Sequence, residues 1–198
     1  MTRWGPDGEE RLRAAAIELF LEKGYDNVTV AQIAERAGLT RRTFSRYFAD
    51  KRDVLFAGSE RLPHALAEAL RHVDPSLDPF ETMLHALADV GAALDDQQIA
   101  DQIAQRRQIM AASPELQERG QAKLATVSHS LAAALRERGA DPSTAKLFAD
   151  VGIAIFRTAF DRWTDAPHEA DLASRIRETA GRLKDAAAGA MDSNGPQA

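Results

Sequence analysis

The segment from Thr29 to Lys51, TVAQIAERAGLTRRTFSRYFADK, constrains the fold of this chain more than any other. Thr29 followed by Gln32 matches a capping box, in which each side chain satisfies a backbone donor near the start of a helix. Gly38 permits the positive φ of a sharp turn, and Thr40 can cap a second helix. The pattern therefore predicts two short helices joined by a tight turn.

The second helix of this pair has two chemically different faces. At 100° per residue, Arg42 and Arg46 lie roughly 160° and 200° from Phe44 around the helix axis. Phe48 lies only about 40° from Phe44, so one face can pack while the opposite face is cationic. A basic outer face on the second helix is typical of a helix-turn-helix that enters the major groove of DNA. A helical hairpin with an ordinary solvated arginine face is the alternative.

Residues 11–55 resemble the DNA-binding domain of the TetR (tetracycline-repressor) family of transcriptional regulators. The resemblance rests on Phe20, Gly24, Tyr25, Thr29, Val30, Ile33, Ala34, Ala37, Gly38, Thr43, Phe44, Phe48 and Lys51. It implies a three-helix, homeodomain-like DNA-binding domain at 1–52 and a ligand-binding and dimerisation domain at 53–188. It also implies a repressor that a small molecule releases from its operator. Residues 189–198 lack periodicity and bulk, which predicts a disordered tail.

We expect nine side chains to contact DNA. Arg41 and Arg42 are candidates for guanine O6 and N7, because one guanidinium can donate to both acceptors. Relatives often carry a small residue or proline in place of Arg42 and tyrosine in place of Ser45, so the operator cannot be copied from a relative. The resemblance assigns four further residues mainly to the DNA backbone. The full set is Thr29, Thr40, Arg41, Arg42, Thr43, Ser45, Arg46, Tyr47 and Lys51.

The distribution of charge supports this placement. The 198-residue chain has a net charge of −5, which by itself argues against a nucleic-acid partner. Residues 1–52, however, carry ten lysines and arginines against eight acidic residues, and 53–198 carry fifteen against twenty-two. Within 35–52 the basic residues outnumber the acidic ones six to two. A local basic patch matters more for DNA binding than the total charge.

The remainder of the chain is predicted to be all-α, with about nine helices in total and about six in a C-terminal bundle. The first helix is expected at 7–23, where it can brace the helix-turn-helix. Residues 53–75 should form a connecting helix that Pro63 kinks, or two helices divided near Pro63. Proline is favoured just inside a helix start. Further starts are therefore expected at Asp78-Pro79, Asp95-Asp96, Ser113-Pro114 and Asp141-Pro142, and one more after Pro167.

Two sets of residues in the larger domain are candidates for binding a small-molecule effector. Arg106 lies on a core-facing stripe with Ile103 and Met110, where a guanidinium is unfavourable unless it is paired. It either forms an internal ion pair, reaches water at the helix end, or holds an anionic effector together with Gln102. Apolar side chains could line a cavity or belong to the plain core. The candidates are Phe80, Met83, Leu87, Gln102, Arg106, Met110, Phe148 and Phe156.

The helix expected at 143–165 is apolar over an unusually wide arc, which favours contact with a second copy of the chain as well as with its own core. Burial within one monomer is the alternative. The TetR resemblance implies a two-fold dimer built from the last two helices, and hence a palindromic operator. Candidate dimer residues are Val151, Ile155, Phe160, Trp163, Leu172, Ile176 and Leu183.

Other functional classes find little support in the sequence. The chain has no cysteine, so disulfides and thiolate chemistry are excluded. Its five histidines lack metal-ligand spacing and no glycine-rich phosphate loop occurs, so we expect no enzyme, metal site or cofactor. No leader or membrane-spanning run is visible, which predicts a cytoplasmic protein with no membrane partner. A ligand-independent DNA-binding regulator or a dimeric scaffold remains the alternative function.

Overall fold

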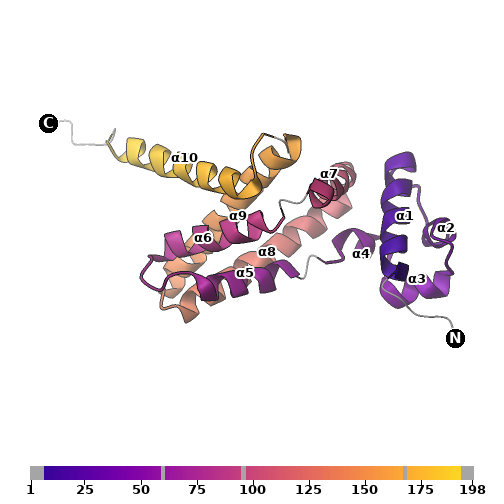
Figure 1. Ribbon diagram of the computed structural model, residues 1–198, viewed down its shortest axis with the longest axis horizontal. Helices are drawn as coiled ribbons and strands as arrows, with labels where there is room; N and C mark the ends of the chain where they lie inside the picture. The colour runs from indigo at the N-terminus through magenta and orange to yellow at the C-terminus, as the bar shows by residue number, and fades with distance from the viewer. Residues whose placement is uncertain (1–6, 59–60, 95–96, 167–168, 193–198) are drawn as a thin grey trace. The chain divides into compact units, whose positions relative to one another are not determined.

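The computed structural model describes residues 7–58, 61–94, 97–166 and 169–192, and these residues form ten α-helices and no strand. This arrangement (Figure 1) confirms the all-α class and has one helix more than the nine expected. The helices are α1 (Asp7–Lys23), α2 (Val30–Arg36), α3 (Arg41–Tyr47), α4 (Lys51–Phe56), α5 (Arg61–His72), α6 (Pro79–Ala92), α7 (Gln97–Ala111), α8 (Pro114–Glu137), α9 (Pro142–Asp165) and α10 (Leu172–Asp192).

Local capping signals determine where several of the helices begin. Thr29 and Gln32 form the predicted capping box at α2, and Thr40 caps α3 through the backbone N–H of Thr43. Asp78 and Asp141 cap α6 and α9, each directly before a proline. These starts, and the start of α8 at Pro114, confirm the predictions. The start predicted at Asp95-Asp96 lies outside the described residues, and α7 begins directly after it.

Two helix boundaries differ from those expected. The region 53–75 is not one kinked helix but follows the alternative of two helices, since α4 ends at Phe56 and α5 begins at Arg61, shortly before Pro63. Pro63 lies in the first turn of α5, where its missing N–H has no intrahelical acceptor to lose. At the other end of the chain, α10 continues to Asp192, past the predicted tail start at Gly189, because the alanine-rich sequence favours helix. The rest of the predicted tail lies outside the described residues.

The chain divides into two compact units that do not follow the sequence order. The first unit comprises Met1–Glu60 and Asp101–Ala122, and the second comprises Arg61–Ala100 and Lys123–Ala198. Helices α7 and α8 therefore each contribute one end to each unit. The functional boundary predicted between residues 52 and 53 stays a prediction.

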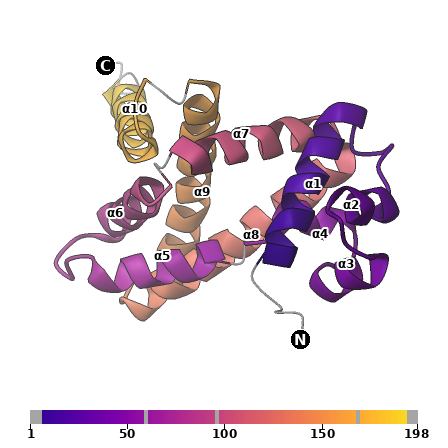
Figure 2. The ribbon, with the colours of Figure 1, turned by 45° about the vertical axis from the view of Figure 1, so that its right-hand side comes forward.

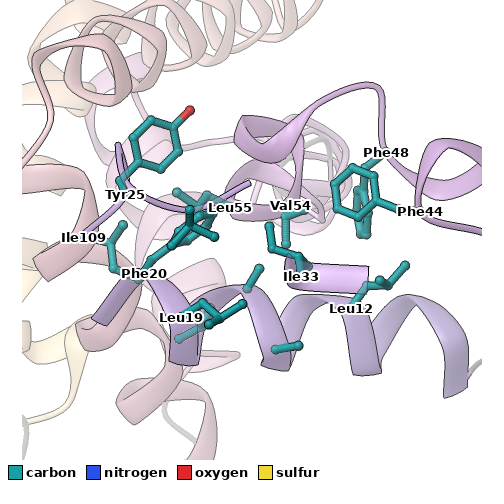
Figure 3. Packing of buried hydrophobic residues seen from close by; sticks show 14 of the residues in the cluster. Leu12, Leu19, Phe20, Tyr25, Ile33, Phe44, Phe48, Val54, Leu55 and Ile109 are labelled. Carbon is teal, nitrogen blue, oxygen red and sulfur yellow. The ribbon is translucent and has the colours of Figure 1, made fainter. Parts of the chain in front are cut away.

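The core of the first unit joins α1 to α4 with parts of α7 and α8. Phe44 and Phe48 pack with their ring centroids 5.5 Å apart, as the helical wheel predicts (Figure 3). Ile109 of α7 and Leu116 of α8 are buried in the same cluster, although they follow α4 by about 50 to 60 residues. Its other large members are Leu12, Ile17, Leu19, Phe20, Tyr25, Val28, Ile33, Val54, Leu55 and Phe56.

In the second unit, α6 lies among α5, α9 and α10 (Figure 2). A glycine allows α6 and α9 to approach closely. A Cβ built on Gly152 would lie 2.5 Å from Sδ of Met83, and Met83 is fully buried. Trp163 of α9 is buried as well, at 1% exposure.

Asp141, the N-cap residue of α9, makes the free energy of unfolding depend on pH. Its carboxylate accepts hydrogen bonds from Ser143 Oγ at 2.6 Å and from the backbone N–H groups of Ser143 and Thr144 at 3.0 and 3.1 Å. These bonds, first that of the Ser143 side chain, hold the pKa of Asp141 well below its ordinary value of 3.8. The carboxylate therefore contributes stability that is fully present above the unfolded-state pKa and lost as the pH falls through the lowered folded-state pKa.

We expect Asp141→Asn to keep the cap, because asparagine caps helices about as well as aspartate. Urea unfolding at neutral pH should give nearly the wild-type free energy, whereas the fall in stability below about pH 4 should be smaller in the variant. Asp89→Asn, which removes an exposed carboxylate of α6, serves as the control for a general charge effect. Equal acid dependence in the wild type and Asp141→Asn would contradict the assignment.

Candidate DNA-binding surface

Helix α3 presents one apolar face to the core and one basic face to solvent. Phe44 is 1% exposed, whereas Arg41, Arg42 and Ser45 are exposed on the same helix. Thr40 accepts the backbone N–H of Thr43 at 3.1 Å, and the two hydroxyl oxygens lie 3.0 Å apart. The hydroxyls of the first turn are therefore already paired with each other, while the guanidinium groups of Arg41 and Arg42 reach the surface.

The turn between α2 and α3 is fixed from α1. Arg11 donates a hydrogen bond to the carbonyl oxygen of Ala37, the C-cap residue of α2. Gly38 follows with a φ of +65°, which favours glycine. A Cβ on Gly38 would also lie 2.9 Å from Nη2 of Arg11, so a side chain would collide with this contact.

Arg46 and Tyr47 lie at the end of α3. The guanidinium carbon of Arg46 lies 4.6 Å from the centroid of the Tyr47 ring, which is a cation–π distance. Arg46 is exposed and Tyr47 is half-buried. A Cβ on Gly8 of α1 would lie 3.1 Å from the Tyr47 hydroxyl, so the tyrosine packs closely on the start of α1.

Thr29 and Lys51 differ in how they could meet DNA. Thr29 is exposed, and its hydroxyl lies 3.3 Å from the backbone nitrogen of Gln32 in the capping box. The TetR resemblance implies a DNA-backbone contact for Lys51, and in the structure of the chain alone its ammonium contacts the protein. Nζ lies within hydrogen-bond distance of the carbonyl oxygens of Tyr25, Asp26 and Val28. A flexible lysine side chain gives no sequence signal for such a contact.

Helix α4 is tied to α7 and α8 by polar contacts that the sequence did not reveal. Arg106 donates from Nε to the carbonyl oxygen of Leu55 at 3.0 Å and from Nη2 to that of Ala57 at 3.3 Å. Its guanidinium therefore has protein acceptors at the end of α4. Of the three alternatives for Arg106, this favours pairing inside the protein, although the acceptors are carbonyl oxygens and not a carboxylate. Its role toward an effector stays a prediction.

Two ion pairs join α4 to α8. Arg52 pairs with Glu115 at 2.7 Å, and Asp53 pairs with Arg119. Arg52 also pairs with Asp50, the N-cap of α4, and its guanidinium lowers the pKa of that carboxyl while burial opposes the change. The two pairs between α4 and α8 were not expected from sequence, because their partners lie more than 60 positions apart.

The eight effector candidates belong to different compact units. Gln102, Arg106 and Met110 lie in the first unit, and the other five lie in the second. Phe80 and Phe148 meet edge to face with centroids 5.6 Å apart. A surface groove of about 380 Å³ along α8 and α9 is lined by none of the eight. The effector cavity stays a prediction. Its candidate residues in the second unit are Phe80, Met83, Leu87, Phe148 and Phe156.

The dimer candidates differ in accessibility. Four of the seven are 0 to 2% exposed in the single chain, namely Ile155, Trp163, Leu172 and Ile176. Side chains already covered by their own helices offer no surface to a partner, so an interface would have to use the others. Val151 and Phe160 are half-buried and Leu183 is 44% exposed. Leu147 of α9, which was not a candidate, is 59% exposed.

The described residues contain no group of three or more histidine, cysteine, aspartate or glutamate side chains placed to hold a metal ion. Among the same residues, no helix has both the length and the apolar character needed to cross a membrane.

Two family models match the chain. The model of bacterial regulatory proteins of the tetR family matches residues 12–57, and the model of the MftR C-terminal domain matches 77–188. The regulator TcmR of Streptomyces glaucescens is 36% identical over 81 residues, which cover 41% of this chain and 36% of TcmR. The chain thus spans about two fifths of the length of the curated relatives it matches.

Solved structures show the same fold. NalD of Pseudomonas aeruginosa, the secondary repressor of a multidrug efflux pump, has a TM-score of 0.63 at 20% identity over 91% of this chain and 97% of its own. FadR of Thermus thermophilus, a repressor in complex with lauroyl-CoA, has a TM-score of 0.56 at 22% identity over 88% and 92%. Since the model at 77–188 alone covers more than half of the 198 residues and the tetR model covers the helix-turn-helix, the chain belongs to the TetR family of transcriptional regulators.

Proposed function

We propose that this protein is a repressor that binds a palindromic DNA operator as a homodimer in the cytoplasm and is released by a small-molecule effector. The observation that carries the proposal is the two-faced helix α3. Phe44 anchors α3 in the core, and Arg41 and Arg42 are exposed beside it. A helix held in this way can place guanidinium groups against base edges in the major groove. No catalytic role is proposed.

Base reading and backbone contact are divided along the surface. Arg41 and Arg42 read guanine, and Thr43 and Ser45 supply shorter contacts to bases or phosphates. Phosphate contacts, which fix the register of the protein on DNA, come from Thr29, Thr40, Arg46 and Tyr47.

Dimerisation uses the outer faces of α9 and α10. Leu147 and Leu183 are among the large apolar side chains that remain exposed in the single chain. Val151 and Phe160 add partly exposed apolar surface. A two-fold arrangement of such faces places two α3 helices on half-sites related by the same symmetry. The operator is therefore an inverted repeat.

The effector binds in the larger helical domain. Because the similar fold of FadR from Thermus thermophilus holds lauroyl-CoA, acyl-CoA thioesters are the first class to test. Fluorescence anisotropy of the protein–operator complex should fall when an effector releases the protein. A complex that no acyl-CoA or retained cellular molecule dissociates would favour the alternative, a ligand-independent regulator.

Selection of bound sites from random DNA duplexes tests DNA reading directly. At about 150 mM salt, where non-specific binding is weakened, we expect an inverted repeat to be enriched. The enriched site would also identify the regulated promoter. Enrichment of no sequence would overturn the proposal.

Arg42→Ala should lose discrimination by about 1–3 kcal/mol at one or two base pairs of that site, because the guanidinium no longer distinguishes guanine. Arg46→Ala is the matched control, since a lost phosphate contact weakens binding to all sequences alike. Competition binding with single-base variants of the site measures both effects. An unchanged base preference in Arg42→Ala would show that another side chain reads those positions.

A further inference from the structure

The ammonium group of Lys51 is surrounded by acceptors from one loop. Lys51 begins α4, and its Nζ lies 2.7 Å from the carbonyl oxygen of Tyr25, 3.1 Å from that of Val28 and 3.4 Å from that of Asp26. Nζ also lies 4.2 Å from the centroid of the Tyr25 ring. An ammonium group has three donors. Three carbonyl oxygens and one aromatic face therefore account for its interactions.

The loop that Lys51 holds, residues 24–29, joins α1 to α2. Gly24 turns the chain after α1 with a φ of +79°, and Thr29 at the other end caps α2. Tyr25 and Val28 anchor the loop in the core at 5% and 2% exposure. The backbone N–H of Val28 bonds the Tyr25 carbonyl at a long 3.3 Å, so Lys51 supplies the shortest bond to that carbonyl.

A phosphate contact would require the ammonium to give up protein acceptors. Each hydrogen bond to a charged group is worth more than a neutral one, so the exchange is unfavourable unless DNA fully replaces it. We propose that Lys51 is a positioning residue, which fixes the loop 24–29 against α4 and so presets Thr29 and α2 for DNA, and does not grip phosphate. This inference rests on the proposed DNA-binding function.

Two substitutions separate positioning from charge. Lys51→Met keeps the aliphatic stem and removes the ammonium. Lys51→Arg keeps the positive charge, but its planar guanidinium does not match three converging carbonyl oxygens. A phosphate contact would tolerate arginine, whereas the loop contact would not.

Operator affinity is measured as a function of salt for the wild type, both Lys51 variants and Arg46→Ala, at a temperature where circular dichroism shows each protein folded. We expect both Lys51 variants to lose affinity about tenfold at every salt concentration, with an unchanged salt slope. Arg46→Ala should lower the magnitude of the slope by about 1.8, because the homodimer loses two phosphate contacts worth about 0.9 each.

A slope lowered by about 1.8 in Lys51→Met, with near-wild-type binding in Lys51→Arg, would assign Lys51 to phosphate and overturn the inference. If folded Lys51→Met bound the operator with unchanged affinity, Lys51 would act only on stability, and the inference would be overturned as well. Amide hydrogen exchange provides a readout without DNA. Exchange at residues 24–29 should accelerate in Lys51→Met relative to the middle of α1, and unchanged exchange would refute the inference even if the wild type selected no operator.

Discussion

Truncation of Phe44 to alanine is expected to lower the free energy of unfolding of the first unit by about 3–5 kcal/mol, because it leaves a cavity in a packed core. The side chain is 1% exposed, and its ring lies 5.5 Å from that of Phe48. Domains of this kind have a total stability of only about 5–15 kcal/mol. Operator binding should fall with it, because α3 loses its main anchor.

Urea unfolding followed by circular dichroism measures the effect. Phe44→Leu is the matched control, since it keeps most of the volume and should destabilise by less than about 1.5 kcal/mol. The two compact units can unfold in separate transitions. The substitution should lower the urea midpoint of the first unit, whereas the transition of the second unit, reported by the fluorescence of Trp163, should keep its midpoint. A wild-type midpoint in Phe44→Ala would contradict the assignment of Phe44 to the core.

Substitution of Gly152 by valine is expected to destabilise the second unit by about 1–3 kcal/mol through overpacking. A Cβ at this position would lie 2.5 Å from Sδ of Met83 and 3.3 Å from Cδ1 of Leu87. Both side chains are buried, at 0% and 1% exposure, so neither can move into solvent. Thermal unfolding measured by tryptophan fluorescence should show a lower midpoint, because Trp163 lies on the same helix.

Gly181→Ala is the control for removing a helical glycine. Gly181 lies inside α10, and no heavy atom outside its own helix backbone lies within 4 Å of a Cβ built there. The free energy of unfolding of this variant should rise by about 0.5–1 kcal/mol, because alanine restricts the unfolded chain and favours helix. If Gly152→Val also raised the free energy of unfolding, α6 and α9 would not pack as closely as they do in the structure.

The features that the sequence predicted well depend on neighbouring residues. The capping box at Thr29, the turn at Gly38 and the aspartate–proline starts of α6 and α9 each need only a few consecutive residues. The two faces of α3 follow from the helical period alone. For this reason the basic surface around Arg41 and Arg42 could be identified before any tertiary contact was known.

The features that it missed depend on distant partners. The helical wheel identifies an apolar face on α9 but not what covers it, so it could not show that Trp163 is buried within its own chain. Arg106 has acceptors at Leu55 and Ala57, about 50 residues away. Lys51 has four rotatable bonds, and its acceptors become neighbours only after α1, α2 and α4 have packed.

The discontinuous first unit also has a consequence for the order of events during synthesis. Ile109 and Leu116 are buried in the same core as Phe44, so this core stays incomplete until those residues have left the ribosome. A chain that ended soon after α4 would expose the apolar surface that α7 and α8 normally cover. We therefore expect truncated products to bind DNA poorly, so that, under the proposed function, operators are occupied mainly by molecules that also carry the larger helical domain.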